Sequence, residues 1–334
     1  MPRILTIILN YRTAEMTLRS AEAALREMAR LDGEVIIVDN ASGDGSFETL
    51  TREAETRGWT TDAKVRVIQS GRNGGFGAGN NVGLRTGLSE GSAPEYYYVL
   101  NSDAFPDPGS ITALLAYLET HSDVGFAGSY IHGPEGDAHL TTFRFPSIAS
   151  ELEGAARFGP ISRLLKDAAV PVPVPEKTQK VDWLAGASLM MRRAVLEEIG
   201  LFDETFFLYF EETDLCRRAA LAGWPTVFVR ESEVTHIGSV STGMKTWRRM
   251  PGYWFASRLH YFTKNHGWFY AVLATKAHVL GGLFWRLRRV LQGKPPADPE
   301  RFLRDLIVHD ARALLSARRE VREPALTPQK GELG

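Results

Sequence analysis

The feature that most constrains the fold is an alternation of short aliphatic runs with longer amphipathic segments in the first part of the chain. The aliphatic runs cover residues 4–9, 34–39, 64–68 and 96–100, and each has the length of a strand. Runs without polar alternation are typical of strands buried on both faces of a parallel sheet. Apolar residues between the first two runs recur at helical spacing. The alternation therefore predicts a doubly wound α/β domain.

Polar residues stand where these predicted strands end. Asn10 and Tyr11 follow the first run, Asp39 ends the second, and the fourth leads into Asn101-Ser102-Asp103. In open α/β sheets, ligands bind at the carboxyl ends of the strands. A carboxylate such as Asp103 can hold a divalent cation there, because hard cations prefer oxygen ligands. On this segment alone, a turn-capping role for Asp103 is the alternative. Asp107-Pro108 then predicts the start of a helix.

A glycine-rich segment, residues 71–83, follows the third run. Glycines let a backbone approach a ligand closely and expose N–H donors. No G-x-G-x-x-G register fits, and the segment does not follow the first strand, so it is not a dinucleotide fingerprint. Asn73, Asn80 and Asn81 add donors and acceptors that favour a binding loop, with a plain loop entering a helix as the alternative.

Three carboxylates open a predicted helix in the second half of the chain. Glu211, Glu212 and Asp214 follow an aromatic run at 206–210. The helix dipole favours acidic residues in a first turn, which is a purely structural explanation. Burial beside aromatic rings would instead raise a carboxyl pKa toward the range of a general base. His236 follows a predicted strand at 226–229, and a lone histidine is more often structural than a ligand.

Composition narrows the class of protein. The net charge of -1 argues against nucleic acid as a partner. Cys216 is the only cysteine, so no internal disulfide can form, and no Cys/His cluster has zinc spacing. The N-terminal apolar run is too short and too weakly basic for a signal peptide. These observations predict a cytoplasmic protein.

Four features follow one another along the chain: the strand ending in Asp39, the Asn101-Ser102-Asp103 segment, the Glu211-Glu212 pair and His236. In this order they resemble the motifs of inverting family 2 glycosyltransferases. The closest resemblance is to bacterial rhamnosyltransferase-like enzymes, and it runs from about residue 4 to 242. It implies a GT-A fold, a Rossmann-like, mixed but mostly parallel sheet flanked by helices. The catalytic domain would span 1–242, with a nucleotide-binding part at about 1–130 and an acceptor part at about 181–242. A helical extension at 243–322 and a disordered tail at 323–334 would follow.

The resemblance also implies how the nucleotide and a metal are held. Asp39 matches the acid that reads the pyrimidine base, and Asn73 with the glycines after it matches the loop at the ribose and base. Asp103 would hold a divalent cation, Mn²⁺ or Mg²⁺, with His236 completing the metal shell. Asn101 replaces the first acid of the family's D-x-D motif, so metal dependence stays open. The full set of predicted nucleotide-binding residues is Asn10, Tyr11, Asp39, Asn73, Gly74, Asn80, Asn101 and Ser102.

The catalytic prediction rests on the acidic pair. Glu212 matches the second member of the pair, which is the catalytic base in the family, and Glu211 is its neighbour. Asp214 is a second candidate base, with orientation of the helix start as its alternative role. Trp183 and Gly186 are predicted on the acceptor side, and core packing is the alternative for Trp183.

The implied reaction moves a sugar from a dTDP-rhamnose or UDP-sugar donor to a glycan or lipid-linked saccharide in cell-surface polysaccharide synthesis. Two alternatives are a sugar-phosphate nucleotidyltransferase and an inactive carbohydrate-binding protein of the same fold. Nucleotidyltransferases have a basic glycine-rich loop after the first strand. This chain lacks that loop, because its residues 10–13 read Asn-Tyr-Arg-Thr. Retention of Asp103 and Glu212 argues against the second.

The C-terminal third changes character. Residues 268–285 are largely apolar but include Lys276 and His278, and their length is at the lower limit for a membrane span. We expect a helix that packs on the catalytic domain or lies in a membrane interface, on the inner face of the plasma membrane. An ordinary helical extension or a homodimer contact explains the segment equally well.

Overall fold

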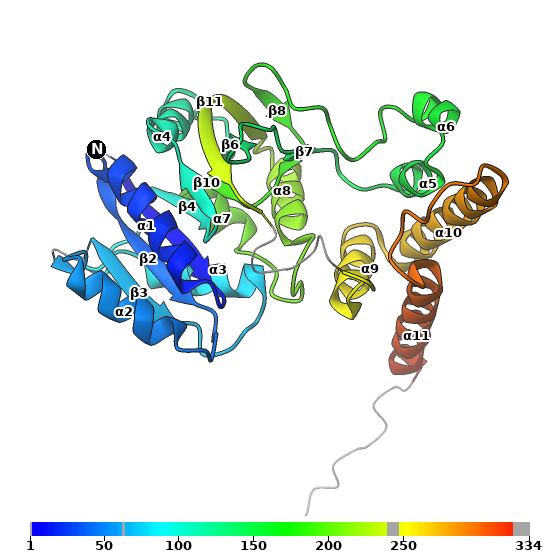
Figure 1. The fold of residues 1–334 in the computed structure, drawn as a ribbon, viewed down its shortest axis with the longest axis horizontal. Helices are drawn as coiled ribbons and strands as arrows, with labels where there is room; N and C mark the ends of the chain where they lie inside the picture. The colour runs from blue at the N-terminus through cyan, green and yellow to red at the C-terminus, as the bar shows by residue number, and fades with distance from the viewer. Residues whose placement is uncertain (1, 62–63, 239–246, 323–334) are drawn as a thin grey trace, which may run out of the picture.

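The computed structural model describes residues 2–61, 64–238 and 247–322. At their centre is a nine-stranded sheet in the order β3-β2-β1-β4-β10-β6-β11-β5, with β8 beside β11 (Figure 1). The strands are β1 Arg3–Asn10, β2 Asp32–Asp39, β3 Val65–Gln69, β4 Tyr96–Asn101, β5 Ala104–Pro106, β6 Phe126–His132, β8 Gln179–Val181, β10 Ser188–Arg192 and β11 Thr226–His236. A separate pair joins β7 Thr142–Phe143 to β9 Trp183–Leu184.

The sheet is mixed but mostly parallel. β1 pairs in parallel with β2 and β4, β2 with β3, and β6 with β11. β10 lies antiparallel between β4 and β6, and β5 and β8 run antiparallel to β11. The predicted α/β fold class is therefore confirmed.

Helices cover both faces of the sheet, as the doubly wound pattern predicts. Leu18 of α1 (Ala14–Met28), Leu50 of α2 (Ser46–Thr56) and Leu114 of α4 (Ser110–Thr120) share one core cluster. Leu84 of α3 (Phe76–Thr86) and Leu215 of α8 (Glu211–Leu221) belong to a second cluster on the other face, together with α7 (Arg193–Ile199).

Strand register aligns the polar residues that follow the aliphatic runs. Asn10 lies opposite Asp39, and Asp39 lies opposite Gln69 on the next strand. On the other side of β1, Leu9 lies opposite Asn101. Because these strands are parallel, their carboxyl ends share one edge of the sheet, and this edge collects the candidate functional residues.

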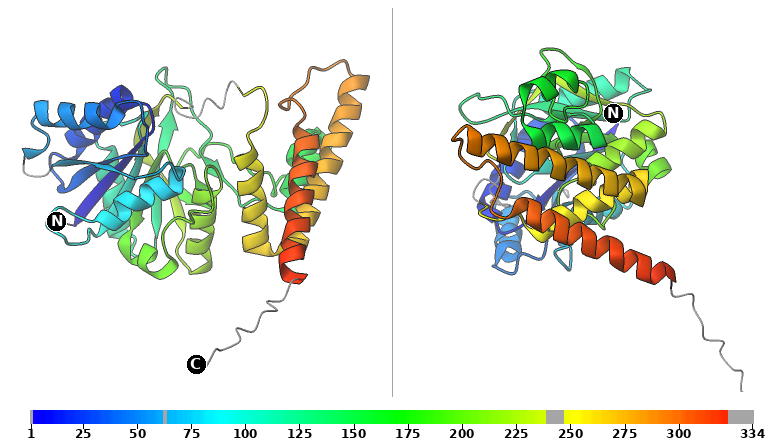
Figure 2. Two further views of the ribbon diagram at one scale, coloured as in Figure 1. Left: turned by 90° about the horizontal axis from the view of Figure 1, so that it is seen from below. Right: turned by 90° about the vertical axis from the view of Figure 1, so that its right-hand side faces the viewer.

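A helical region stands beside the sheet domain, as the left panel of Figure 2 shows. It contains α5 Ile148–Ala156, α6 Gly159–Leu164, α9 Gly252–His266, α10 Trp268–Leu291 and α11 Phe302–Arg322. Arg157 has a left-handed φ of 47° and ends α5, so α6 is a separate helix. The predicted boundary at 242 and the predicted tail at 323–334 lie outside the described residues. No helix in the described ranges combines the length and apolar character needed to cross a bilayer.

The segment after Asp103 differs from the prediction. α4 begins at Ser110 with Gly109 as its N-cap, so Asp107-Pro108 does not start the helix. A short strand, β5, intervenes, and the Asp107 carboxylate accepts hydrogen bonds from His132 and Thr235 instead. The sheet contacts of β5 with β11 thus override the local capping signal.

Candidate active site

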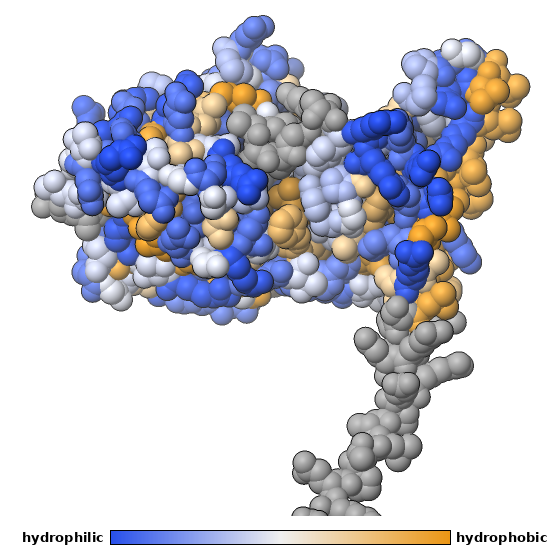
Figure 3. Space-filling view, turned by 60° about the horizontal axis from the view of Figure 1, so that its bottom comes forward, coloured by the Kyte–Doolittle hydropathy of each residue, from blue (hydrophilic) through white to orange (hydrophobic). Residues whose placement is uncertain are grey.

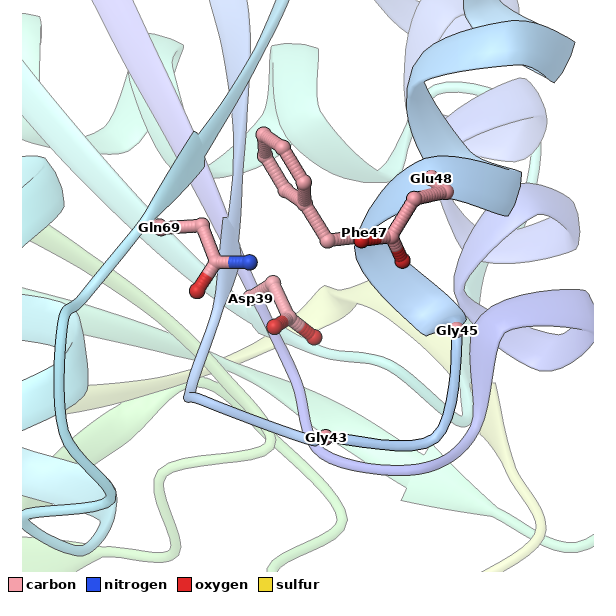
Figure 4. Close-up of a pocket in the computed structure, with 6 residues that line it drawn as sticks. All are labelled: Asp39, Gly43, Gly45, Phe47, Glu48 and Gln69. Carbon is pink, nitrogen blue, oxygen red and sulfur yellow. The ribbon is translucent and has the colours of Figure 1, made fainter.

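Asp39 lines a pocket of about 320 Å³ at the carboxyl edge of the sheet. Figure 4 shows its carboxylate beside the Gln69 amide, with the Phe47 ring on the wall. Gly43, Gly45 and Glu48 complete the lining. Sequence reasoning predicted Asp39 but missed Gln69 and Phe47, which become neighbours only through strand register and the turn into α2.

Hydrogen bonds hold the Asp39 side chain in place. Its Oδ1 atom accepts from Asn10 Nδ2 at 2.7 Å and from Ser42 Oγ at 2.5 Å. The Ser42 backbone N–H donates to Oδ2 at 3.1 Å. Asn10 is fully buried and Asp39 is 1% exposed. The spacing of Asp39 and Ser42, three residues apart after a strand, was a readable turn signal.

A hydrogen-bonded chain joins this pocket to the end of β4. Asn10 Oδ1 accepts from Thr13 Oγ1 at 3.3 Å, and the Thr13 and Ser102 hydroxyl oxygens lie 3.2 Å apart. Ser102 is buried, whereas Tyr11 is half-buried with the Arg12 guanidinium over its ring. The predicted nucleotide residues Asn10, Asp39 and Ser102 are therefore connected through Thr13.

The glycine-rich segment serves close packing. A Cβ on Gly75 would lie 1.7 Å from the Phe207 carbonyl oxygen, so only glycine lets this loop meet the turn before α8. A Cβ on Gly79 would meet Leu9, and one on Gly83 would meet Ile7. These glycines bring α3 down onto β1, a role that the composition of the segment did not reveal.

The asparagines of this segment hold the loop and the helix. Asn73 Oδ1 accepts from Asn40 Nδ2 at 3.0 Å and from the Gly75 N–H at 3.1 Å. Gly74 precedes this turn and lies against Ala78. Asn80 donates to the Phe76 carbonyl, and its buried Oδ1 has no hydrogen-bond partner in the described part of the chain.

The Asp103 and His236 side chains meet at the end of the β5–β11 ladder. His236 Nε2 lies 3.0 Å from Asp103 Oδ1 and 3.4 Å from Asn101 Nδ2. Asp103 is 5% exposed and His236 is half-buried. Two neighbouring ligands of an octahedral ion with bonds of about 2.1 Å are also about 3 Å apart. The carboxylate and imidazole therefore fit a divalent cation.

A second group, Asp107, His132 and Glu233, could also hold a metal ion, because its ligand atoms all lie within 4.8 Å of one another. His132 Nε2 donates to Asp107 Oδ2 at 2.9 Å. Although burial opposes it, the hydrogen bonds to the Gly133 carbonyl and to Asp107 raise the pKa of His132. Thr235 contacts Asp107, and the next residue, His236, contacts Asp103. Successive strand residues point to opposite faces, so the two groups lie on opposite faces of β11.

Glu211 and Glu212 begin α8 after a strained turn. Tyr209 and Phe210 both have a left-handed φ of 70°, which costs about 1–3 kcal/mol each and is typical of functional sites. Burial, and then the neighbouring Glu212, raise the pKa of Glu211 well above its ordinary value. Burial also raises the pKa of Glu212. In the described part of the chain, Oε2 of each is buried without a hydrogen-bond partner.

The two glutamates face different neighbours. Glu211 is 2% exposed and lies against Gly77, which Phe202 also approaches. Glu212 is half-buried and accepts a hydrogen bond from the Gly186 N–H. The next residue, Ala187, accepts from the Asn101 N–H at 3.0 Å. Residues 186–187 therefore bring Glu212 beside the segment that carries Asp103.

Asp214 and Trp183 have structural contacts. Asp214 is fully buried and accepts from Arg218 and Lys264, each at 2.8 Å, and from Asn265 at 3.1 Å. These bonds tie α8 to α9 and favour the orienting role of Asp214 over the role of a base. Trp183 stacks on Phe143 at 4.2 Å and donates to the Arg144 carbonyl. This placement favours packing within the β7–β9 pair.

Comparison with known proteins identifies the family. The family model described as "Glycosyltransferase like family 2" matches residues 2–258. The chain belongs to glycosyltransferase family 2. It is 30% identical over 249 residues to the N-acetylglucosaminyl-diphospho-decaprenol L-rhamnosyltransferase of Mycobacterium tuberculosis, covering 72% of this chain and 78% of the relative. It is 29% identical over 216 residues to the low-salt glycan biosynthesis hexosyltransferase Agl10 of Haloferax volcanii, covering 64% of this chain and 60% of that one. The predictions of this family and of a sugar-transferring enzyme are confirmed.

Solved structures share the GT-A fold. The mannosyltransferase PcManGT from Pyrobaculum calidifontis, in complex with GDP-Man and Mn²⁺, has a TM-score of 0.57 at 16% identity, covering 96% of this chain and 81% of that one. GalNAc-T7 with UDP, GalNAc and Mn²⁺ has a TM-score of 0.53 at 13% identity, covering 98% of this chain and 59% of that one. At these identities the similarity shows the fold alone.

Proposed function

We propose that this family 2 glycosyltransferase moves rhamnose or another hexose from a dTDP- or UDP-sugar to a lipid-linked saccharide in cell-surface polysaccharide synthesis. The observation that carries the proposal is the meeting of three parts at one sheet edge: the Asp39 pocket, the Asp103–His236 pair and Glu212. The Mycobacterium tuberculosis relative, whose name specifies a decaprenol-linked acceptor and L-rhamnose, supports this substrate class.

We assign the nucleotide base to the Asp39 pocket. The hydrogen bonds from Asn10 and Ser42 hold the carboxylate against rotation. This side chain therefore loses little conformational entropy when it binds a base. The diphosphate would then extend toward Ser102 and Asp103. A divalent cation, which Asp103 and His236 would hold, supplies the positive charge that makes a nucleoside diphosphate a good leaving group.

Glu212 is the proposed general base. The acceptor hydroxyl oxygen attacks the anomeric carbon, the bond from that carbon to the diphosphate oxygen breaks, and the hydroxyl proton passes to Glu212. Burial raises the pKa of this carboxyl, which increases its affinity for the proton that it must take. One displacement of this kind inverts the anomeric configuration.

Thermal unfolding with UDP, dTDP or GDP, each with and without Mn²⁺, tests the assignment. A nucleotide at about 100 times its Kd stabilises a fold by about 2.7 kcal/mol. We expect dTDP or UDP to stabilise the protein, with a larger effect when Mn²⁺ is present. Asp39→Asn should remove the effect of the nucleotide, and Asp103→Asn should remove only the increment due to Mn²⁺.

Asp107→Asn is the matched control, because it removes the equivalent carboxylate from the second candidate metal group. Loss of the Mn²⁺ increment in Asp107→Asn, with retention in Asp103→Asn, would move the metal to Asp107, His132 and Glu233. Stabilisation by GDP alone would overturn the proposed donor class, and no response to any nucleotide would overturn the function.

A further inference from the structure

The helix α10 packs with its small residues inward. Its buried positions are mostly alanine and glycine, namely Ala271, Ala274, Ala277, Gly281, Gly282 and Trp285. A Cβ on Gly281 would lie 2.8 Å from the Leu152 carbonyl oxygen of α5, and one on Gly282 would lie 2.8 Å from Leu303 of α11. The neighbouring helices therefore approach the α10 backbone closely and leave its large side chains on the other face.

Those large side chains form an exposed apolar band along the second half of α10. They recur at three- and four-residue spacing, which places them on one helix face. The band consists of Leu280, Leu283, Phe284, Leu287, Val290 and Leu291, each between 37% and 76% exposed. Ile307, Val308 and Leu315 of α11 are also exposed. Figure 3 shows the apolar surface along the outer edge of the helical region, and contiguous surface of this kind marks an interaction site.

The charged residues that α10 itself contributes beside the band are all positive. α10 contains Lys276, Arg286, Arg288 and Arg289 and no acidic residue. Arg286 and Arg288 each neighbour Leu287 in sequence, and a helix turns by about 100° per residue, so they lie on the two flanks of the band. Arg286, Arg289 and Arg301 line a pocket of about 300 Å³ together with Asp298 and Glu300. None of the three arginines that line this pocket forms an ion pair with another residue that the structure describes.

We propose that the apolar band of α10 lies in the surface of an anionic lipid membrane, with Arg286 on its flank against the lipid phosphates. A helix with one apolar face, flanking arginines and too little length or hydropathy to span is suited to the interface. The long arginine side chains can reach the head groups while the leucines enter the acyl boundary. This inference goes beyond the proposed function and does not depend on it.

The charge pattern favours lipid over a second copy of the chain. A twofold contact through α10 would bring the same basic residues together from both copies, and α10 offers no carboxylate to pair them. In the adjoining loop and helix, the carboxylates are already paired: Asp298 with Arg157, Glu300 with Arg248 and Asp305 with Arg249. An anionic bilayer supplies the missing negative charge.

Flotation with vesicles tests the proposal. We expect the full chain to float with vesicles of equal parts phosphatidylcholine and phosphatidylglycerol, and much less with phosphatidylcholine alone. Leu283→Gln/Leu287→Gln should lower partitioning by about tenfold per leucine. Arg286→Gln should lower it by roughly fivefold and weaken its dependence on salt.

Leu221→Gln is the matched control, because Leu221 is an exposed leucine of α8 outside the band, and it should float like the wild type. Absence of flotation, or equal flotation of the leucine variant, overturns the proposal. A dimer in solution that only the leucine variant dissociates would assign the band to a second copy instead. Nucleotide-induced stabilisation, measured on every variant, shows that each one is folded and tests the proposed function separately.

Discussion

The helical region and the sheet edge both bury a pair of carboxylates, but with opposite surroundings. In the helical region, Arg258 is fully buried between two acids. It donates to Glu151 at 2.6 Å and lies 3.3 Å from Asp310. His278 donates to the same Glu151 oxygen at 2.7 Å. Burial by itself would raise the pKa of Glu151. Arg258 and His278 outweigh this effect and lower the pKa to about 2.

At the sheet edge, Glu211 and Glu212 have no such cation among their described neighbours. Burial raises the pKa of both carboxyls, and each keeps one buried oxygen without a hydrogen bond. A buried charge that is paired holds helices together, whereas a buried acid that is unpaired costs stability and is found where chemistry needs it. The contrast separates a structural cluster from the proposed catalytic one within a single chain.

The largest expected effect comes from Glu212→Gln, which removes the proposed base. Turnover should fall by roughly 10²–10⁴-fold, because that is the usual contribution of general-base catalysis. Nucleotide binding should persist, as read from thermal stabilisation. Glu211→Gln is the matched variant and should retain more activity. If Glu211→Gln were the inactive variant and Glu212→Gln turned over normally, the two roles would be exchanged.

Arg258→Met removes the cation from the buried cluster of the helical region. It leaves Glu151 and Asp310 buried without their cation, and we expect a loss of about 3–5 kcal/mol in the free energy of unfolding. Urea denaturation measures this value. Arg288→Met is the control, because Arg288 packs over the Phe158 ring near the surface, and it should cost far less. Equal losses in the two variants would show that the buried cluster contributes nothing special.

The two regions should also respond to pH with opposite sign. The folded pKa of Glu151, about 2, lies below its ordinary 4.5, so its contribution is present above about pH 4.5 and is lost as pH falls toward 2. That gap corresponds to about 3 kcal/mol. The folded pKa of Glu211 is raised, so its contribution is present below about pH 4.5 and is lost as pH rises.

Unfolding free energies of the wild type, Glu151→Gln and Glu211→Gln across this pH range check the signs. Glu151→Gln should lose part of the acid-side dependence, and Glu211→Gln should lose part of the dependence toward alkaline pH. A Glu211→Gln variant whose stability tracks the wild type at every pH would show that Glu211 is not a protonated buried acid.

The aliphatic pattern was sufficient to predict the α/β class and the strands β1 to β4, but not β5 or β8, which are set by pairing with β11. The aliphatic runs indicated buried parallel strands, and the residues after them were expected to meet because parallel strands end at one edge. Asn10, Asp39 and Asn101 were therefore predictable as neighbours, and register confirms this. Their proposed roles came from the family resemblance and remain to be tested.

Only the tertiary structure decided what distant segments do to one another. It placed Gly75 under the Phe207 carbonyl, surrounded Asp214 with Lys264 and Asn265 of α9, and moved Asp107 from a helix cap to a contact with His132. It also left the leucines of α10 exposed, because α5 and α11 pack on its alanines and glycines. The local sequence pattern carries information about the periodicity of helices and strands and about where strands end. Side-chain partners are set instead by packing between segments that lie far apart in the chain, and no local periodicity encodes them.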